Sequence, residues 1–207
     1  MNKIIAFTGL PMTGKSTARK IMQRLLDEKG IANDYVHLGS TEEVARRDVE
    51  NDWTSEESVM SQGAKEQLIR ERWRSESGMG VMAEKATAEI KDLLENGKVV
   101  VIDNLYSDEE RTVLRKHFGE DCLLVVALAA DWHVRVRRGN NRPERPLTAE
   151  EIKERDHAEV YNLHRGPTIA LADFMIVNNI DEQSDADGAQ KVIETALRER
   201  VLPVLLS

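Results

Sequence analysis

The chain is poor in cysteine and has no long apolar run. Its single cysteine, Cys122, excludes a disulfide framework and a paired-cysteine metal site, and is typical of a reducing compartment. The longest apolar run, Leu123 to Ala130, is too short to span a bilayer, and no basic and apolar leader opens the chain. No repeat or low-complexity tract is present. We therefore expect 1–207 to form a single cytoplasmic domain that is not bound to a membrane.

The chain also has fewer positive than negative residues. The chain has 29 lysine and arginine residues against 37 aspartate and glutamate residues, a net charge of -8. Such a surface repels polyanions, so nucleic acid is not an expected partner and any phosphate-binding charge must be local. The five histidines show no metal-ligand spacing, and no Ser/His/Asp or Cys/His arrangement predicts a covalent nucleophile. The expected partner is a small molecule.

A phosphate-binding loop is present near the start of the chain. From Gly9 to Ser16 the sequence is GLPMTGKS, which matches G-x-x-x-x-G-K-[ST] at every fixed position. The apolar run 3–8 before it predicts a buried strand, and the apolar spacing after Ser16 predicts a helix ending at Gly30. Strand, glycine loop and helix are the context that this motif requires. We interpret the loop as a cradle for a nucleoside triphosphate; the alternative is a structural loop that happens to carry glycine and lysine.

The chemistry of this loop predicts ATP and Mg²⁺ as cofactors. Gly9 and Gly14 let the backbone pass close to phosphate oxygens, so that N–H groups and the helix N-terminus point at the anion. Lys15 is expected to reach the β and γ phosphates and to be catalytic, while the Ser16 hydroxyl is expected to ligate the metal. The predicted cofactor-binding residues of the loop are Gly9, Met12, Thr13, Gly14, Lys15, Ser16 and Thr17.

Strands and helices alternate along the rest of the chain. Further strands are predicted at 35–38, 99–102, 123–128 and 174–178, and helices at 79–95, 107–118, 132–138, 148–163 and 189–201. Capping boxes open two of these helices, Ser107 with Glu110 and Thr148 with Glu151. The alternation predicts a three-layer α/β/α fold with a five-stranded parallel sheet. Right-handed crossovers then bring Thr8, Gly39 and Asp103 to one edge of that sheet.

Asp103 is the second candidate for the chemistry. It follows the four apolar residues 99–102, the form of a Walker B strand that delivers an acid to the edge of the sheet. There it can hold Mg²⁺ through water or orient an acceptor, so we expect it to be a metal ligand and a catalytic residue. The alternative is an ordinary turn residue after a strand.

The segment 131–147 has the composition of a lid. It carries five arginines against two acids, in a chain whose net charge is negative. Cations that close on a transferring phosphoryl group and exclude water are a main catalytic resource in phosphoryl transfer, and Arg138 and Arg142 are the predicted catalytic members. The alternative is a solvated basic face paired with the glutamates of 150–154.

The segment 40–97 contains no predicted strand. It is expected to be a helical insertion that contacts the acceptor. It should hold two or three helices, with Arg70 and Arg74 on one face at i, i+4. Glu66 lies four residues before Arg70 and could simply pair with it. The two interpretations of this cluster are equally supported by the sequence.

The chain resembles the P-loop nucleoside and nucleotide kinases, and more narrowly the dephospho-CoA-kinase-like group. The similar stretches are the phosphate loop, 101–103 with 107–110, Arg155-Asp156 with Glu159, and 169–173 followed by 176–178. The resemblance implies a five-stranded parallel core, an arginine lid after the fourth strand, and adenine contacts from Arg138 in the lid and from Asn178 with the loop that follows it.

The sequence also departs from the pattern of that group. True dephospho-CoA kinases resemble one another in an acid after the second strand, whereas this chain has His-Leu-Gly-Ser at 37–40, and Tyr106 stands where related chains often carry arginine. We therefore expect ATP- and Mg²⁺-dependent transfer to a small phosphorylated acceptor, a nucleoside monophosphate or deoxynucleotide. The alternatives are dephospho-CoA as acceptor, and a non-kinase regulator that binds ATP and hydrolyses it slowly.

Overall fold

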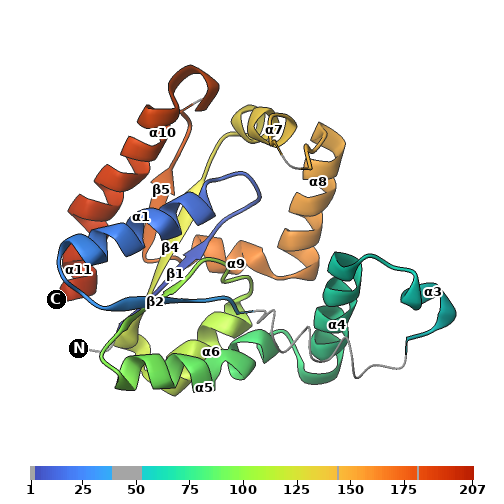
Figure 1. The fold of residues 1–207 in the computed structure, drawn as a ribbon, viewed down its shortest axis with the longest axis horizontal. Helices are drawn as coiled ribbons and strands as arrows, with labels where there is room; N and C mark the ends of the chain where they lie inside the picture. Colours follow the sequence, from blue (N-terminus) through green and yellow to red (C-terminus); the bar gives the residue numbers. More distant parts are fainter. Residues whose placement is uncertain (1–2, 39–52, 144, 181) are drawn as a thin grey trace.

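A five-stranded parallel sheet forms the centre of the molecule (Figure 1). The computed structural model describes residues 3–38, 53–143, 145–180 and 182–207. The strands have the order β2-β3-β1-β4-β5, and every neighbouring pair is parallel. Their bounds are β1 Ile4–Thr8, β2 Asn33–Val36, β3 Val99–Ile102, β4 Leu123–Ala129 and β5 Phe174–Val177. The three-layer α/β/α prediction is confirmed.

The helices connect these strands and cover both faces of the sheet. They are α1 Lys15–Glu28, α3 Ser55–Ser58, α4 Gln62–Ser77, α5 Val81–Glu95, α6 Asp108–Phe118, α7 Trp132–Asn140, α8 Ala149–His157, α9 Arg165–Ala170, α10 Glu182–Ala196 and α11 Leu202–Leu206. Three short turns complete the described elements, the 3₁₀ turn η1 Glu120–Cys122 and the π-turns η2 Ala158–Asn162 and η3 Leu197–Val201. Among the described helices, none has both the length and the apolar character needed to cross a bilayer.

Alternation along β1 divides the core into two layers. Ile5 and Phe7 point to the face covered by α1, α10 and α11, whereas Ile4 and Ala6 point to the face covered by α5 and α6. All four side chains are fully buried. This central strand is therefore held rigidly from both sides, and it delivers the phosphate loop from its C-terminal end.

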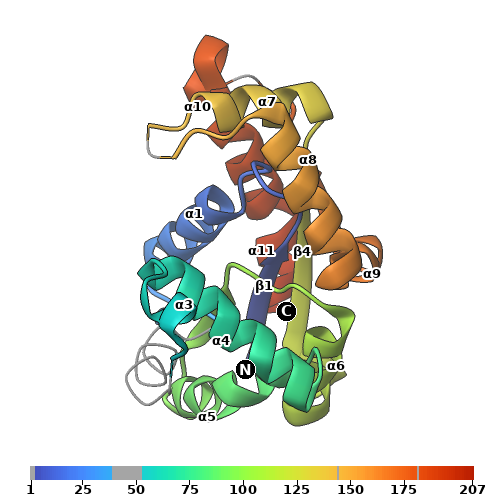
Figure 2. The ribbon, with the colours of Figure 1, turned by 90° about the vertical axis from the view of Figure 1, so that its right-hand side faces the viewer.

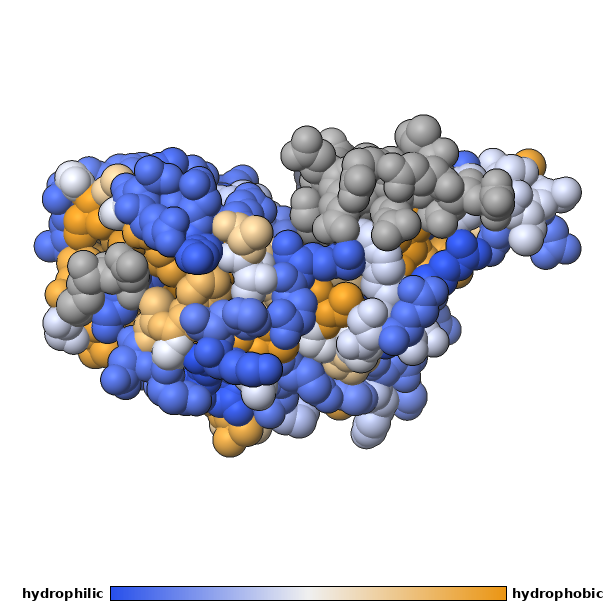
Figure 3. All heavy atoms as spheres, turned by 90° about the horizontal axis from the view of Figure 1, so that it is seen from below, coloured by the Kyte–Doolittle hydropathy of each residue, from blue (hydrophilic) through white to orange (hydrophobic). Residues whose placement is uncertain are grey.

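The region of α3 and α4 projects from the body of the sheet (Figures 1 and 2). Seen from the side of α5 and α6, it extends away from a surface that is mostly hydrophilic (Figure 3). The helical character predicted for 40–97 is correct for 53–97, while Gly39 and 40–52 lie outside the described residues. The helix α4 buries little apolar surface beyond Ile69, which fits a segment that forms one wall of a site rather than part of the core.

Helix ends follow the predicted capping signals. Both capping boxes are formed, with Glu110 and Glu151 each bonded back to the start of its helix. Gly30 follows α1 with φ +70°, as a residue at that C-terminal position requires.

Other boundaries differ from the prediction. The strand predicted at 35–38 is at Asn33–Val36, because β2 is an edge strand and its polar first residues pair with β3 without being buried. The last helix begins at Glu182 and not at 189, and after the π-turn η3 the chain stays helical to Leu206. Pro203 lies in the first turn of α11, directly after η3. The short helix α9 was not predicted.

Candidate functional site

The phosphate loop has the backbone geometry that its sequence predicts. Gly9 has φ +140° and Gly14 has φ +102°, a region that other residues rarely adopt. A Cβ at Gly9 would lie 2.3 Å from the carbonyl oxygen of Leu128, and one at Gly14 would lie 3.0 Å from Nδ2 of Asn178. Glycine is therefore required at both positions, and α1 begins immediately afterwards at Lys15.

Lys15 is a half-buried cation within this loop. Its Nζ donates hydrogen bonds to the carbonyl oxygens of Gly9 at 2.7 Å and Leu10 at 3.0 Å. Burial, together with the nearby Arg165, lowers the pKa of Lys15 to about 7, although Glu159 and Asp103 act in the opposite direction. A lysine with so little compensating negative charge fits a site whose ligand brings the anion, as a triphosphate does.

The two predicted metal ligands lie on adjacent elements of the same edge. Asp103 directly follows β3, and its carboxylate contacts Nε of Arg19 at 3.5 Å and the hydroxyl of Tyr35 at 3.3 Å. Ser16 is exposed in the first turn of α1. A hydroxyl and a carboxylate are the oxygen ligands that Mg²⁺ accepts, and it keeps several waters or phosphate oxygens besides. Within the described residues no cluster of three or more His, Cys, Asp or Glu side chains could hold a metal ion.

Arg138 and Asn178, two predicted cofactor-binding residues, contact the backbone of the loop at Met12 and Thr13. Met12 has φ +65°, an uncommon conformation for a residue with a side chain, and its carbonyl accepts a hydrogen bond from Nη1 of Arg138 at 3.0 Å. Nη2 of Arg138 also reaches the carbonyls of Asn178 at 3.1 Å and Ile180 at 2.8 Å. The Thr13 hydroxyl bonds to Leu10, and its carbonyl accepts from Asn178. Arg138 and Asn178 thus lie beside the loop, and the contacts that they make with it are to backbone carbonyls.

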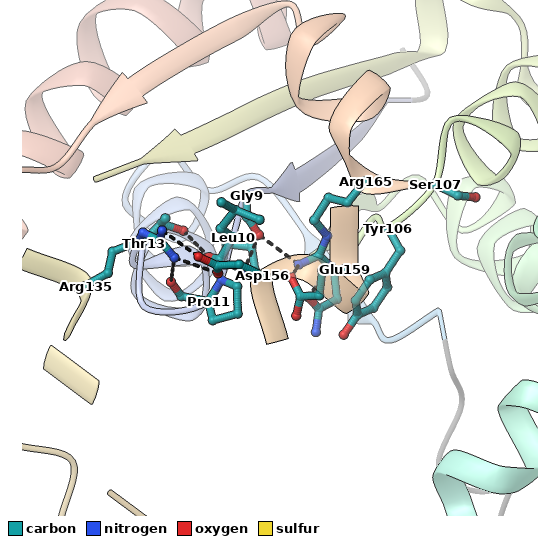
Figure 4. Close-up of polar contacts among 12 residues, drawn as sticks. Gly9, Leu10, Pro11, Thr13, Tyr106, Ser107, Arg135, Asp156, Glu159 and Arg165 are labelled. Carbon is teal, nitrogen blue, oxygen red and sulfur yellow. Dashed lines mark hydrogen bonds and ion pairs between the residues drawn. The ribbon is translucent and has the colours of Figure 1, made fainter. Parts of the chain in front are cut away.

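The lid arginines divide into two groups. Arg135 is almost buried and makes a two-pronged ion pair with Asp156 of α8 at 2.8 and 2.7 Å, while Nη1 also reaches the carbonyl of Pro11 at 3.4 Å (Figure 4). Arg142 is exposed in the loop after α7. The solvated pairing with 150–154 is not found for Arg135, because its partner is Asp156, two positions beyond that segment. The helix predicted at 132–138 continues to Asn140 in α7.

Arg165 is the main site residue that the sequence analysis missed. Its side chain is fully buried at the start of α9, where Nη1 donates to the carbonyl of Gly9 at 2.8 Å and pairs with Glu159. Nη2 reaches Asn104 at 3.3 Å, and the guanidinium carbon lies 3.7 Å from the centre of the Tyr106 ring (Figure 4). The only sequence signal was the stretch around Glu159 that carries the family resemblance. Tyr106 stands where the family resemblance implies an arginine. The guanidinium of Arg165, which comes from α9, lies over the Tyr106 ring.

A cavity of about 430 Å³ lies beside this cluster. Its walls come from α4, α5, α6, α8 and η2, so the insertion and the segment after the lid face one another across it. Three arginines line it, Arg70, Arg74 and Arg155. Arg70 pairs with Glu66 at 3.1 Å, as the structural alternative predicted, and it still lines the cavity. Burial lowers the pKa of Arg74, so this cation lacks full compensation.

Glu110 closes the inner end of the cavity. Its side chain is fully buried, and Oε2 accepts hydrogen bonds from the backbone N–H groups of Tyr106 at 2.7 Å and Ser107 at 3.3 Å. Burial raises the pKa of Glu110 to about 7, because a charged group loses hydration when it is buried, although the two N–H bonds and Arg74 oppose the shift. The sequence analysis predicted the cap and did not predict that the same side chain lines a cavity.

Comparison with known proteins agrees with this geometry. A family model described as an AAA domain matches residues 5–162. A UPF0200 protein of Thermococcus onnurineus is 32% identical over 200 residues, covering 95% of this chain and 99% of the relative. A UPF0200 protein of Pyrococcus abyssi is 32% identical over 198 residues, covering 94% and 97%.

Solved structures share the fold at lower sequence similarity. A shikimate kinase from Bacteroides thetaiotaomicron has a TM-score of 0.52 at 16% identity, covering 95% of this chain and 97% of its own. The protein TT1252 from Thermus thermophilus has a TM-score of 0.57 at 18% identity, covering 97% and 98%. The fold and the loop together define a P-loop NTPase with a kinase-like fold. Within that class, the chain belongs to the UPF0200 family.

Proposed function

We propose that this protein is an ATP- and Mg²⁺-dependent kinase that phosphorylates a small, already phosphorylated acceptor, a nucleoside monophosphate or deoxynucleotide. The observation that carries the proposal is the position of the arginine-lined cavity next to the phosphate-loop lysine. Glu159 lines the cavity and also pairs with Arg165, which is bonded to the loop at Gly9. Donor phosphates on the loop and an anionic acceptor in the cavity would therefore be neighbours.

On the donor side, the loop binds the phosphates of ATP. Backbone N–H groups at the start of α1 and the ammonium of Lys15 hold the β and γ phosphates, replacing the two carbonyl contacts that Lys15 makes in this structure. A magnesium ion held by Ser16 and Asp103 would neutralise charge on the β and γ oxygens. Arg138 keeps the loop in position at Met12, and Arg142, which is exposed like Arg137 and Arg145, is the lid cation proposed to close over the transferring group.

On the acceptor side, the cavity offers the positive charges of Arg70, Arg74 and Arg155 to an anionic acceptor. A phosphate oxygen of the acceptor attacks the γ phosphorus, the bond from that phosphorus to the β-phosphate oxygen breaks, and ADP leaves. A phosphate acceptor is already anionic near neutral pH and needs no general base. Asp103 is held by Arg19 and Tyr35, which favours a role with the metal over a role as a base.

The proposal is tested by a product screen. Nucleoside monophosphates, deoxynucleotides and dephospho-CoA are each incubated with ATP and Mg²⁺, and products are detected by mass spectrometry. We expect ADP together with a nucleoside diphosphate. Phosphorylation of dephospho-CoA alone would assign a hydroxyl acceptor, and slow ATP hydrolysis with no phosphorylated product from any acceptor would favour the regulator; either result would contradict the proposal.

A further inference from the structure

Two side chains of the cavity have opposite charge and face it without binding one another. Glu110 Oε1 is fully buried and no described residue donates a hydrogen bond to it; Nε of Arg74 is also buried without a described acceptor. Their charges interact, but no ion pair joins them in the described structure. A buried acceptor and a buried donor left open in this way are costly unless a ligand group fills the space between them.

Four apolar or aromatic side chains among the remaining lining residues favour a flat group with apolar faces. Leu38 and Met82 are buried side chains that line the cavity, and Leu163 and the ring of Tyr106 line it as well. Small-molecule sites combine such apolar walls with a few polar groups that fix orientation, and a volume of about 430 Å³ lies within their usual range. A sugar phosphate would leave these walls unused, whereas a nucleobase has apolar faces and a polar edge.

The polar groups of the cavity come from different elements. Arg155 comes from α8 and Glu159 from η2, which are linked to the phosphate loop through the ion pairs of Asp156 with Arg135 and of Glu159 with Arg165, whereas Glu110 comes from α6 and Met82 from α5. An acceptor lying with its phosphate toward Arg155 would place its other end at Glu110.

We propose that Glu110 and Arg74 select the acceptor by the hydrogen-bonding edge of a nucleobase. This inference rests on the proposed function. Oε1 of Glu110 accepts a hydrogen bond from an N–H of the base, and Nε of Arg74 donates to the neighbouring oxygen or ring nitrogen. Oε2 of Glu110 stays on the helix cap, which holds the carboxylate in one orientation. The acceptor is then a nucleoside monophosphate, recognised by a donor and an acceptor side by side, and not a sugar phosphate.

The test measures binding without ATP, so it is independent of phosphoryl transfer. Isothermal titration calorimetry compares AMP, GMP, CMP, UMP and ribose 5-phosphate on the full chain. We expect at least one nucleotide to bind about 10- to 100-fold more tightly than ribose 5-phosphate, the range for a hydrogen bond to a charged group. Methylation of the donor nitrogen on the preferred base should remove that advantage.

Variants then assign the selection to these residues. Glu110→Gln turns the amide N–H₂ toward the base while its oxygen keeps the cap, so the advantage of the preferred nucleotide should disappear and the affinity for ribose 5-phosphate should be unchanged. Arg74→Lys keeps the charge without Nε and should act in the same direction. Glu151→Gln is the matched control, because Glu151 forms the same kind of capping box on the exposed helix α8.

Failure of the inference and failure of the proposed function are distinguishable. Any of three results would overturn the inference. The first is that Glu110→Gln still prefers the same nucleotide over ribose 5-phosphate as strongly as the wild type does. The second is that the wild type binds ribose 5-phosphate and every nucleotide equally well, and the third is that Glu110→Gln loses the same affinity for the nucleotide and for ribose 5-phosphate. If Glu110→Gln does not fold, Arg74→Lys and the methylated nucleotide decide by the same criteria. Absence of phosphoryl transfer in the product screen would overturn the proposed function alone.

Discussion

Arg165 donates a hydrogen bond to the carbonyl oxygen of Gly9 at 2.8 Å, across 156 positions of sequence. This bond joins the first residue of the phosphate loop to the segment that follows the lid. The same guanidinium pairs with Glu159 and lies on the ring of Tyr106, so a single buried side chain connects the loop to the wall of the acceptor cavity. The donor and acceptor sites therefore share a structural support.

Replacement of Arg165 by methionine should destabilise the protein strongly. The substitution leaves Glu159 and the Gly9 carbonyl without their partner in a buried place, and loss of one member of a buried ion pair costs about 3–5 kcal/mol. Urea denaturation measures the change. Arg24→Met is the control, because Arg24 also binds two carboxylates, Glu28 and Glu194, but on the exposed surface, and its loss should have a much smaller effect. Equal destabilisation by the two variants would contradict this account.

Glu110 should make stability depend on pH. Its pKa is raised to about 7 from an ordinary value of 4.5, so between these values the folded state binds more protons than the unfolded state. The free energy of unfolding contributed by this group is therefore highest below pH 4.5 and falls as the pH rises through about 7. Urea denaturation across this range should show that fall in the wild type, and Glu110→Gln should lack it. A stability difference between the two proteins that does not vary with pH would refute the burial effect.

Substitutions of Arg142 and Arg138 should change different properties of the enzyme. Arg142→Ala should lower kcat about 10²-fold with little change in ATP affinity or thermal stability, because an exposed lid cation acts on charge that develops during transfer. Arg138→Met should lower thermal stability and ATP affinity as well, because Arg138 binds the carbonyls of Met12, Asn178 and Ile180. Steady-state kinetics and thermal unfolding separate the two patterns. Unchanged kinetics in Arg142→Ala would identify that residue as part of a solvated face.

Asp103→Asn tests the division between a metal ligand and a general base. With a phosphate acceptor, the variant should lose activity that a higher Mg²⁺ concentration partly restores, and the wild-type pH profile should show no limb from a catalytic carboxylate. Kinetics at several Mg²⁺ concentrations make the measurement. Inactivity that Mg²⁺ cannot rescue, together with a hydroxyl-bearing acceptor, would instead make Asp103 a base.

Local patterns in the sequence were sufficient to predict the fold and the donor side of the candidate site. The phosphate loop is defined by eight consecutive residues, and its glycines have the φ angles that the motif requires. Both capping boxes depend on residues three positions apart, so they too could be recognised directly. Asp103 could be recognised because it directly follows the four apolar residues of β3.

The rest of the site depends on contacts between distant segments. Nothing near Arg135 in sequence indicates Asp156, 21 positions away, and nothing near Arg165 indicates Gly9. The cap at Glu110 was predictable, but its burial depends on the packing of α6 against α5 and α9. A one-dimensional pattern identifies which residues can make a local contact, whereas the acceptor cavity is created only when five elements meet.

Lys15 provides the most direct test of the central claim that the phosphate loop is the catalytic site. Lys15→Ala removes a cation whose burial is already unfavourable, so the fold should persist although two hydrogen bonds to loop carbonyls are lost. Phosphoryl transfer should fall by about 10³-fold or more, because the positive charge on the β and γ phosphates is gone. Lys20→Ala, an exposed lysine on the same helix, is the control. Thermal unfolding and turnover are measured on the same samples: an intact fold with lost turnover is the predicted result, and normal turnover in Lys15→Ala would show that the chemistry takes place elsewhere.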